Sequence, residues 1–152
     1  MLTTVVGNLY ETTWRIKLKK YKQKQAMPTE RIEAMIKGFP CSQAHYKGEG
    51  LEPITEMCLT ASKEELGAYL KLTAYVYIKR AGKKQGESIY KEIGKIATYF
   101  DWFERHTWCT NLGGIKVPEV MHINSVLELF GFDELTYEES DFIVELQAKY
   151  NN

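Results

Sequence analysis

The chain has 152 residues, of which 44% are hydrophobic and 26% are charged. This length and balance are typical of one folded domain, and they exclude a disordered chain or a small disulfide-stabilised scaffold. The formal net charge is zero, with 20 Lys and Arg against 20 Asp and Glu, which differs from the basic composition typical of nucleic-acid-binding domains.

The cysteine content favours a reducing compartment. Cys41, Cys58 and Cys109 are an odd number at wide spacing, whereas a secreted disulfide framework has an even number. The N-terminus lacks the pattern of a signal peptide, and no stretch approaches the 18 apolar residues of a membrane span. We therefore expect one soluble, cytoplasmic domain over residues 1–152, with no membrane contact.

The charges are unevenly distributed along the chain. Residues 1–48 carry nine Lys and Arg and three Glu, a net charge of +6, while residues 117–152 carry one Lys and eight Asp and Glu, a net charge of −7. Such a division orients a partner of complementary charge, or it means that the two ends pack together and neutralise each other. We favour the second interpretation.

In the first half of the chain, the spacing of apolar residues predicts three helices. Apolar residues recur every three or four positions over residues 6–21, although residues 14–18 also alternate as in a strand, and Pro28 ends this segment. Thr29 is placed to cap a short helix that continues to Lys37. A loop follows over residues 39–52, and Pro53 suits the first turn of the next short helix.

The second half contains the stronger helix signals. Ser62 and Glu65 form a predicted capping box for a long helix that ends at Gly82. After a turn, a second long helix is predicted from about residue 87 to residue 106, and the short connection favours antiparallel neighbours. The inward stripe predicted for the first of these helices comprises Leu66, Tyr69, Leu70, Val76 and Tyr77.

Beyond these helices we expect a brief strand over residues 115–117, followed by two more helices. Pro118 starts the first, which Gly131 ends, and a capping box of Thr136 and Glu139 opens the last. The predicted fold class is therefore mainly α, a single compact domain of five to six helices with one or two short strands allowed.

A basic run near the N-terminus is a candidate nucleic-acid contact. Arg15, Lys17, Lys20 and Lys24 lie within ten residues, and the three lysines share one face of a helix. Rows of this kind bind phosphates, and the neighbouring aromatic residues are able to stack on unpaired bases. The alternative is a solvated outer face with no ligand.

Aromatic residues crowd the end of the second long helix. Phe100 and Phe103 fall on the apolar stripe and suit the core. Trp102 falls off that stripe, and together with Trp108 it is a candidate exposed binding residue, because Trp is enriched in the energetic centres of protein interfaces. Packing beneath a neighbouring loop is the alternative.

Two Cys and His pairs have the short internal spacing of zinc ligands. Cys41 precedes His45 by four residues, and His106 precedes Cys109 by three. We expect no cofactor, with zinc at these four residues as the alternative. The Glu119 and His122 pair has the spacing of a di-iron half-site but lacks a second copy, which favours an ordinary solvated helix face.

The sequence contains neither a Gly-x-Ser-x-Gly element nor a phosphate-binding P-loop, and it does not decide whether the protein is an enzyme. The leading hypothesis is a small non-enzymatic binding protein, a regulator or inhibitor of a larger protein or nucleoprotein complex. A mobile-element or viral origin is suggested only by the small size and the unfamiliar sequence. The alternatives are a nucleic-acid-binding protein that uses the basic N-terminal helix and an enzyme with an unrecognised Cys/His or zinc site.

Overall fold

The computed structural model describes residues 28–43 and 52–152, and within these ranges it contains six α-helices and no strand. This confirms the predicted mainly helical fold; the helix predicted over residues 6–21 lies outside the described residues. No helix in the described ranges is long and apolar enough to cross a membrane. The helices are α2 (Glu30–Ile36), α3 (Pro53–Thr60), α4 (Lys63–Arg80), α5 (Ile89–Arg105), α6 (Val120–Leu129) and α7 (Tyr137–Tyr150), with short 3-10 turns η1 (Pro40–Ser42) and η3 (Leu112–Gly114).

Three predicted helix starts are confirmed by their hydrogen bonds, whereas α6 begins at Val120, two residues after the predicted start at Pro118. The Thr29 hydroxyl accepts from the Ile32 backbone N–H at the start of α2. Ser62 and Thr136 each form a complete capping box with the Glu three residues later, at the starts of α4 and α7. Such caps satisfy backbone N–H groups that have no partner within the helix.

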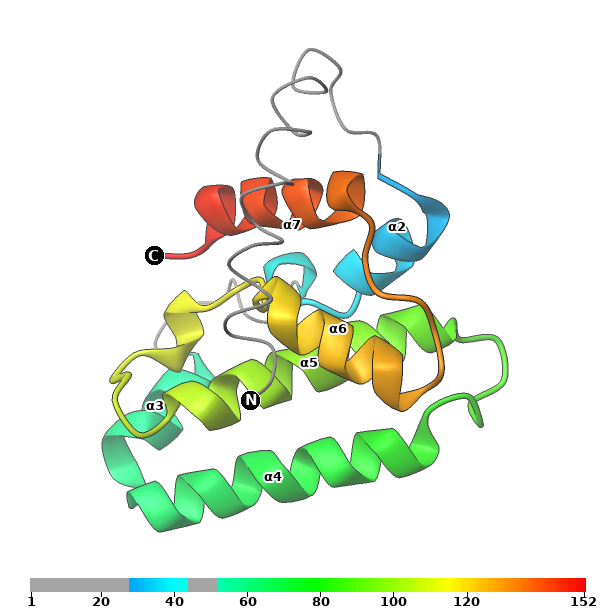
Figure 1. The fold of residues 1–152 in the computed structure, drawn as a ribbon. Helices are drawn as coiled ribbons and strands as arrows, with labels where there is room; N and C mark the ends of the chain where they lie inside the picture. Colours follow the sequence, from blue (N-terminus) through cyan, green and yellow to red (C-terminus); the bar gives the residue numbers. More distant parts are fainter. Residues whose placement is uncertain (1–27, 44–51) are drawn as a thin grey trace, which may run out of the picture.

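α5 is the central helix of the molecule, and it packs against α4, α2 and α6. Figure 1 shows α4 and α5 side by side, with α6 and α2 on the opposite side of α5 and α7 beyond them. The turn between α4 and α5 uses Gly82 and Gly86, both at a positive φ that only glycine adopts readily. This arrangement leaves α4 as an outer element, with α5 on one side of it.

The contact between α2 and α5 depends on two glycines. Gly38, just after α2, faces the backbone of α5, and Gly94 of α5 faces the backbone of α2. A Cβ at Gly38 would lie 2.1 Å from the Lys91 carbonyl oxygen, and a Cβ at Gly94 would lie 2.3 Å from the Met35 carbonyl oxygen. Both distances are shorter than any real Cβ contact. The backbones therefore approach as closely as they do because both positions lack a side chain.

The buried side chains form two core clusters, and α5 contributes to both. The first cluster unites α2, the first half of α5, α6 and α7. The second cluster unites α3, the first half of α4, the end of α5 and the turn around η3. Its fully or nearly fully buried members are Ile54, Leu66, Leu70, Trp102, Leu112 and Ile115.

The predicted strand over residues 115–117 is not formed. The backbone N–H groups of Lys116 and Val117 donate to the Asn151 side-chain oxygen at 2.8 and 2.9 Å, and the Asn151 amide donates back to the Val117 carbonyl. The Lys116 carbonyl accepts from the Cys41 N–H. The backbone groups of this extended segment are thus satisfied by the Asn151 and Trp102 side chains and by the η1 turn, so no partner strand is needed.

The basic and acidic ends of the chain meet at one described point. The Arg31 guanidinium donates to both carboxylate oxygens of Glu139, at 2.8 and 2.6 Å, and the Glu139 side chain is only 2% exposed. Thr29 donates to the same carboxylate at 2.6 Å. This contact ties α2 to α7 and agrees with the favoured interpretation of the charge distribution at this place.

Candidate interaction surface

α4 is apolar on two opposite sides, and only one of them is buried. Leu66, Leu70 and Ala74 face the core and are at most 5% exposed. On the opposite side, Leu72 is 61% exposed and Val76 is 46% exposed. We call this side the outer face of α4, defined by Glu65, Ala68, Tyr69, Leu72, Tyr75, Val76 and Lys79, which recur every three or four positions.

Two residues of the outer face correct the sequence prediction. Tyr69 and Val76 were expected to point inward with Leu66 and Leu70, but they are 40% and 46% exposed. Tyr75, also on the outer face, is 57% exposed. Monomeric proteins seldom leave several large apolar side chains together in water, so such a group is a candidate interaction site.

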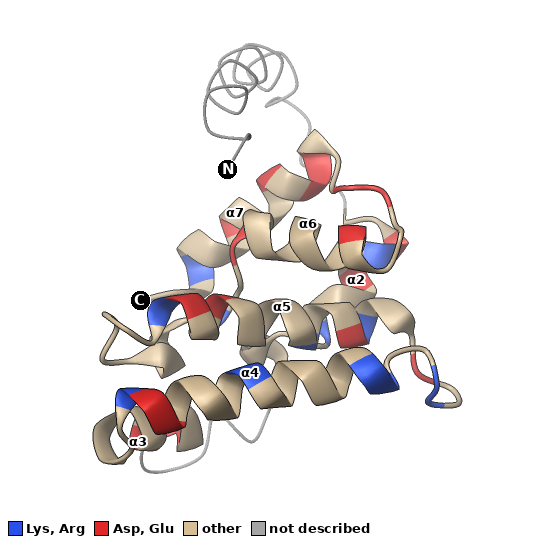
Figure 2. Cartoon of the chain, turned by 60° about the horizontal axis from the view of Figure 1, so that its bottom comes forward, with Lys and Arg blue, Asp and Glu red and all other residues tan. Residues whose placement is uncertain are grey.

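The two ends of the outer face carry opposite charges. Glu64 and Glu65 lie in the first turn of α4, and Lys79 and Arg80 lie in the last turn. The Ser62 backbone N–H holds the pKa of the Glu65 carboxyl below its usual value, so Glu65 is negatively charged at neutral pH. Figure 2 shows α4 in front, with red and blue near its N-terminal end, blue in its middle and at its C-terminal end, and tan over the rest.

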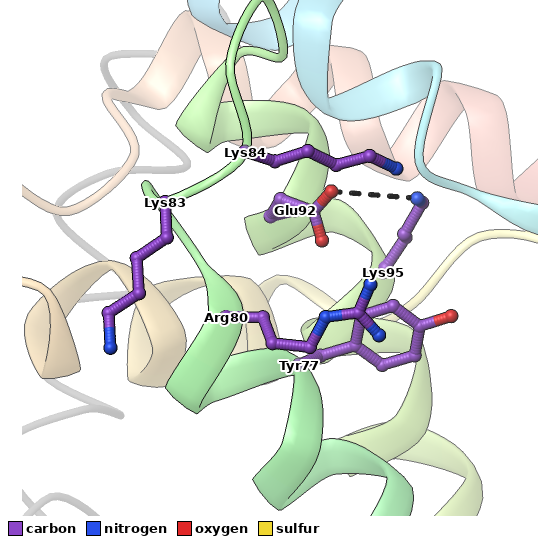
Figure 3. Close-up of a pocket in the computed structure, with 6 residues that line it drawn as sticks. All are labelled: Tyr77, Arg80, Lys83, Lys84, Glu92 and Lys95. Atoms are coloured by element: carbon purple, nitrogen blue, oxygen red, sulfur yellow. Dashed lines mark ion pairs between the residues drawn. The ribbon is translucent and has the colours of Figure 1, made fainter.

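A basic cleft lies beside the C-terminal end of α4, at the turn into α5. It has a volume of about 350 Å³, and its lining contains four basic side chains and one acidic side chain. Figure 3 shows Lys84, Lys95 and Glu92 directed toward one another, whereas Lys83 points away from them. The residues that line it are Tyr77, Arg80, Lys83, Lys84, Glu92 and Lys95.

Two carboxylates offset part of the positive charge in the basic cleft. Glu92 Oε1 lies 3.6 Å from Lys95 Nζ, and burial raises the pKa of Glu92. Glu87 lies 2.8 Å from Lys91 Nζ and 3.4 Å from Lys84 Nζ, and hydrogen bonds from Glu92 and Lys91 lower the pKa of Glu87 to about 2. The cleft therefore retains a modest positive charge, suited to an anion.

A polar cluster joins the end of α5 to the start of α6. Asp101 is fully buried, where it pairs with Arg105 at 2.5 Å and accepts the Glu119 backbone N–H at 2.8 Å. Arg105 also pairs with the Glu119 carboxylate. Burial raises the pKa of Asp101, against the lowering effect of these contacts. The cluster satisfies the Glu119 backbone N–H at the start of α6, which explains its position.

The Glu119 and His122 pair is not the solvated helix face that we expected in the absence of a second Glu-x-x-His pair. Glu119 pairs with Arg105, and His122, only 8% exposed, lies 2.7 Å from Glu104 of α5 through Nε2. Both side chains therefore cross from α6 to α5. This arrangement fixes the packing of the two helices and leaves no second half-site for a pair of metal ions among the described residues.

The structure separates the two tryptophans that were predicted as binding residues. Trp102 is 2% exposed and donates its indole N–H to the Ile115 carbonyl at 3.3 Å, so the prediction that it is exposed is wrong. Trp108 is 68% exposed, with the Arg105 guanidinium 5.9 Å from its ring centroid. Phe103, expected in the core, is 42% exposed.

The remaining predicted site residues are placed only in part. Arg15, Lys17, Lys20 and Lys24 lie outside the described residues, as does His45. Cys41 packs against the first core cluster and Cys109 against the second. His106 Nδ1 lies against the Phe103 carbonyl oxygen.

Among residues 28–43 and 52–152, no three His, Cys, Asp or Glu side chains group as a metal ion would require. Zinc at Cys41, His45, His106 and Cys109 therefore stays a prediction. Elemental analysis of the purified protein tests it directly, because zinc held by four such ligands copurifies with the protein.

No protein family, curated protein or solved structure matches this chain. The fold and its exposed surfaces are therefore the basis for a functional proposal. Within the part of the chain that the structure describes, α4 is an outer helix with an exposed apolar face that lies beside a basic cleft.

Proposed function

We propose that this protein is a small non-enzymatic binding protein that docks onto another protein through the outer face of α4, as a regulator or inhibitor of a larger protein or nucleoprotein complex. The observation that carries this proposal is the exposure of Tyr69, Leu72, Tyr75 and Val76 on one side of a single helix. Burying apolar surface contributes roughly 25 cal/mol per Å², so covering these side chains favours association.

The shape of this surface favours a protein partner over a small molecule. A row of side chains on a helix is convex and fits against another helix or into a protein groove, where anchors recur every three or four residues. Small molecules bind in concave sites that enclose most of their surface. Tyr69 and Tyr75 add large contact area with a polar tip, as is common at protein interfaces.

Photo-crosslinking tests the proposal at single-residue resolution. Leu72 is replaced by the photoreactive residue p-benzoylphenylalanine, and a control variant carries it at Leu129, which is similarly exposed, at 55%, but lies on α6. We expect a defined protein adduct from position 72 and none from position 129. Adducts from neither position, or equal adducts from both, would contradict docking through α4.

Nucleic-acid binding is the second candidate function, and the basic cleft favours it. Arg80, Lys83, Lys84 and Lys95 line this cleft, and its positive charge is only partly offset by Glu92. Backbone phosphates bind to clusters of this kind without sequence preference. The basic run from Arg15 to Lys24 remains a separate prediction of the same function.

Fluorescence anisotropy with a labelled single-stranded oligonucleotide, measured over a salt series, tests whether the basic cleft binds nucleic acid. Replacing both Lys83 and Lys84 with Ala should reduce the slope of log affinity against log salt by about 1.4 if both contact phosphates. Lys63, at the opposite end of α4, provides the control substitution. Absence of binding at low salt would rule out this candidate function.

A further inference from the structure

The charge pattern along α4 also identifies a partner. We infer that the outer face of α4 binds the same face of a second copy of this chain, with the two helices antiparallel about a two-fold axis at Leu72. This inference rests on the proposed function, because it takes the outer face of α4 as a protein-docking surface and names a second copy as its occupant in the free protein. Two-fold pairing of identical surfaces is the commonest way in which soluble proteins associate.

The outer face is symmetric about Leu72 in the way that such a pair requires. In an antiparallel pair centred on Leu72, a residue a given number of positions before it faces the residue the same number after it. Tyr69 and Tyr75 lie three positions to either side, and both are exposed aromatic residues. Each tyrosine would therefore face the other tyrosine of the second copy, in a contact favourable between aromatic rings.

The charges at the two ends match in the same register. Glu65 and Lys79 lie seven positions to either side of Leu72, and Glu64 and Arg80 lie eight positions to either side. All four side chains are exposed. The antiparallel pair therefore places each carboxylate opposite a cation, and it also opposes the two helix dipoles.

The parallel alternative brings like charges together. There, the acidic first turns of the two helices would lie side by side, and so would Lys79 and Arg80 of the last turns. Like charges in contact are destabilising, so charge selects the antiparallel orientation. The same pattern argues for a second copy over an unrelated helix, because this face supplies both members of every pair.

The size of the surface sets the expected affinity. A stable interface buries about 800 Å² on each partner, and one face of a single helix provides less than this. The four large apolar side chains at the centre provide the driving force, while the exposed ion pairs at the rim contribute little. We therefore expect a reversible dimer with a dissociation constant in the micromolar range.

Sedimentation equilibrium of the full chain, across micromolar concentrations, measures this dimer directly. Leu72→Glu places two carboxylates on the two-fold axis, and we expect the dissociation constant to rise by roughly a hundredfold or more. The control is Leu129→Glu, which makes the same charge change at an exposed position of α6 and should leave the dimer intact. A dimer that survives Leu72→Glu would overturn the inference.

A charge-reversal experiment tests the antiparallel orientation. Lys79→Glu places a second carboxylate opposite Glu65 at each end of the dimer, and it should weaken the dimer by about tenfold. Glu65→Lys should weaken it in the same way. A mixture of the two variants restores a carboxylate opposite a lysine at both ends, so mixed dimers should form with an affinity near that of the unmodified chain.

Glu65→Lys also removes the carboxylate of the capping box, so circular dichroism first establishes that α4 is retained in this variant. If α4 is not retained, Lys79→Glu alone decides the orientation. In a parallel pair Lys79 faces the Lys79 of the second copy, so the variant replaces one contact between like charges with another and leaves the affinity unchanged. An unchanged dissociation constant for Lys79→Glu would overturn the antiparallel pair.

The failure of this inference is distinguishable from failure of the proposed function. If the chain remains monomeric while position 72 crosslinks to a different protein, the dimer is wrong and docking through α4 stands. If position 72 crosslinks to no protein, both are wrong. A crosslink between two copies at position 72, together with loss of the dimer in Leu72→Glu, supports the dimer, whereas docking onto a larger protein is supported only by an adduct with that different protein.

Discussion

Glu139 shows how much one buried charge depends on its neighbours in this protein. Its carboxylate accepts hydrogen bonds from Arg31 and Thr29 of the α2 region and from the Thr136 backbone at the start of α7. Burial opposes its ionisation, but these contacts together hold the pKa of Glu139 at about 2, below its usual 4.5. Glu139 therefore stays charged because its hydrogen-bond partners are held in place at the starts of α2 and α7.

The pKa of Glu139 predicts an acid-sensitive contribution to stability. Because this pKa is lowered in the folded state, the unfolded chain binds more protons between about pH 4.5 and pH 2. The contribution is fully present above pH 4.5 and is lost as the pH falls toward 2. Glu139→Gln keeps a side chain suited to the capping box but removes the charge, and we expect it to lower the free energy of unfolding by about 2 kcal/mol at pH 7.

Urea denaturation at a series of pH values measures this effect. The difference between the unmodified chain and Glu139→Gln should shrink steadily as the pH falls from 5 to 2. Glu138→Gln, at the exposed neighbouring position, is the matched control and should change stability little. A difference that stays constant over this pH range would show that the charge of Glu139 is not its source.

At the scale of the helices, local signals were sufficient to predict starts and ends but not which face is buried. Ser62 and Thr136 act within four residues of sequence, so their capping boxes were predictable. α4 carries apolar residues on two sides, and periodicity alone does not indicate which side meets α5. The outer face was therefore missed, although its regular spacing was visible in the sequence.

Trp102 is the opposite case, a residue that helical periodicity predicted to be exposed and that is buried. It lies off the main apolar stripe of α5, but the segment around η3 returns over it, and Ile115 supplies the acceptor for its indole N–H. This contact joins residues 13 positions apart through a loop with no regular pattern. Burial that depends on the path of a loop is not encoded in helical periodicity.

The close approach of α2 and α5 gives a prediction at this scale. Gly94→Ala would place a Cβ 2.3 Å from the Met35 carbonyl oxygen, and since this is backbone, α2 has to shift. We expect a loss of about 2 kcal/mol in the free energy of unfolding, although alanine favours a helix over glycine by about 1 kcal/mol.

Gly67→Ala in α4 is the control for this prediction. The new Cβ there would meet the end of the His106 side chain, at 2.8 Å, which is able to move. Thermal unfolding of both variants should show the larger loss for Gly94→Ala. If Gly67→Ala were equally destabilising, the rigidity of the opposing backbone would not be the cause.

At the scale of the whole molecule, the two core clusters are connected through α4 and α5. α5 supplies Ile96 to the first cluster and Trp102 to the second, while α4 supplies Leu70 to the second and packs Tyr77 against the first. Because α4 and α5 each belong to both clusters, neither helix can unfold without exposing apolar surface in both clusters. From this continuity we predict that the described part of the chain unfolds as one cooperative unit.

Substitutions in the separate clusters test this cooperativity. Ile96→Ala and Leu70→Ala each remove a fully buried side chain, and each should lower the free energy of unfolding by about 3 kcal/mol. If the clusters form one unit, either variant lowers the hydrogen-exchange protection of α6 and of the second cluster by the same amount, because both exchange through global unfolding. Leu129→Ala, at an exposed position of α6, should leave protection nearly unchanged. Should Ile96→Ala reduce protection only around the first cluster, the two clusters would be separate units and the single-domain prediction would be wrong.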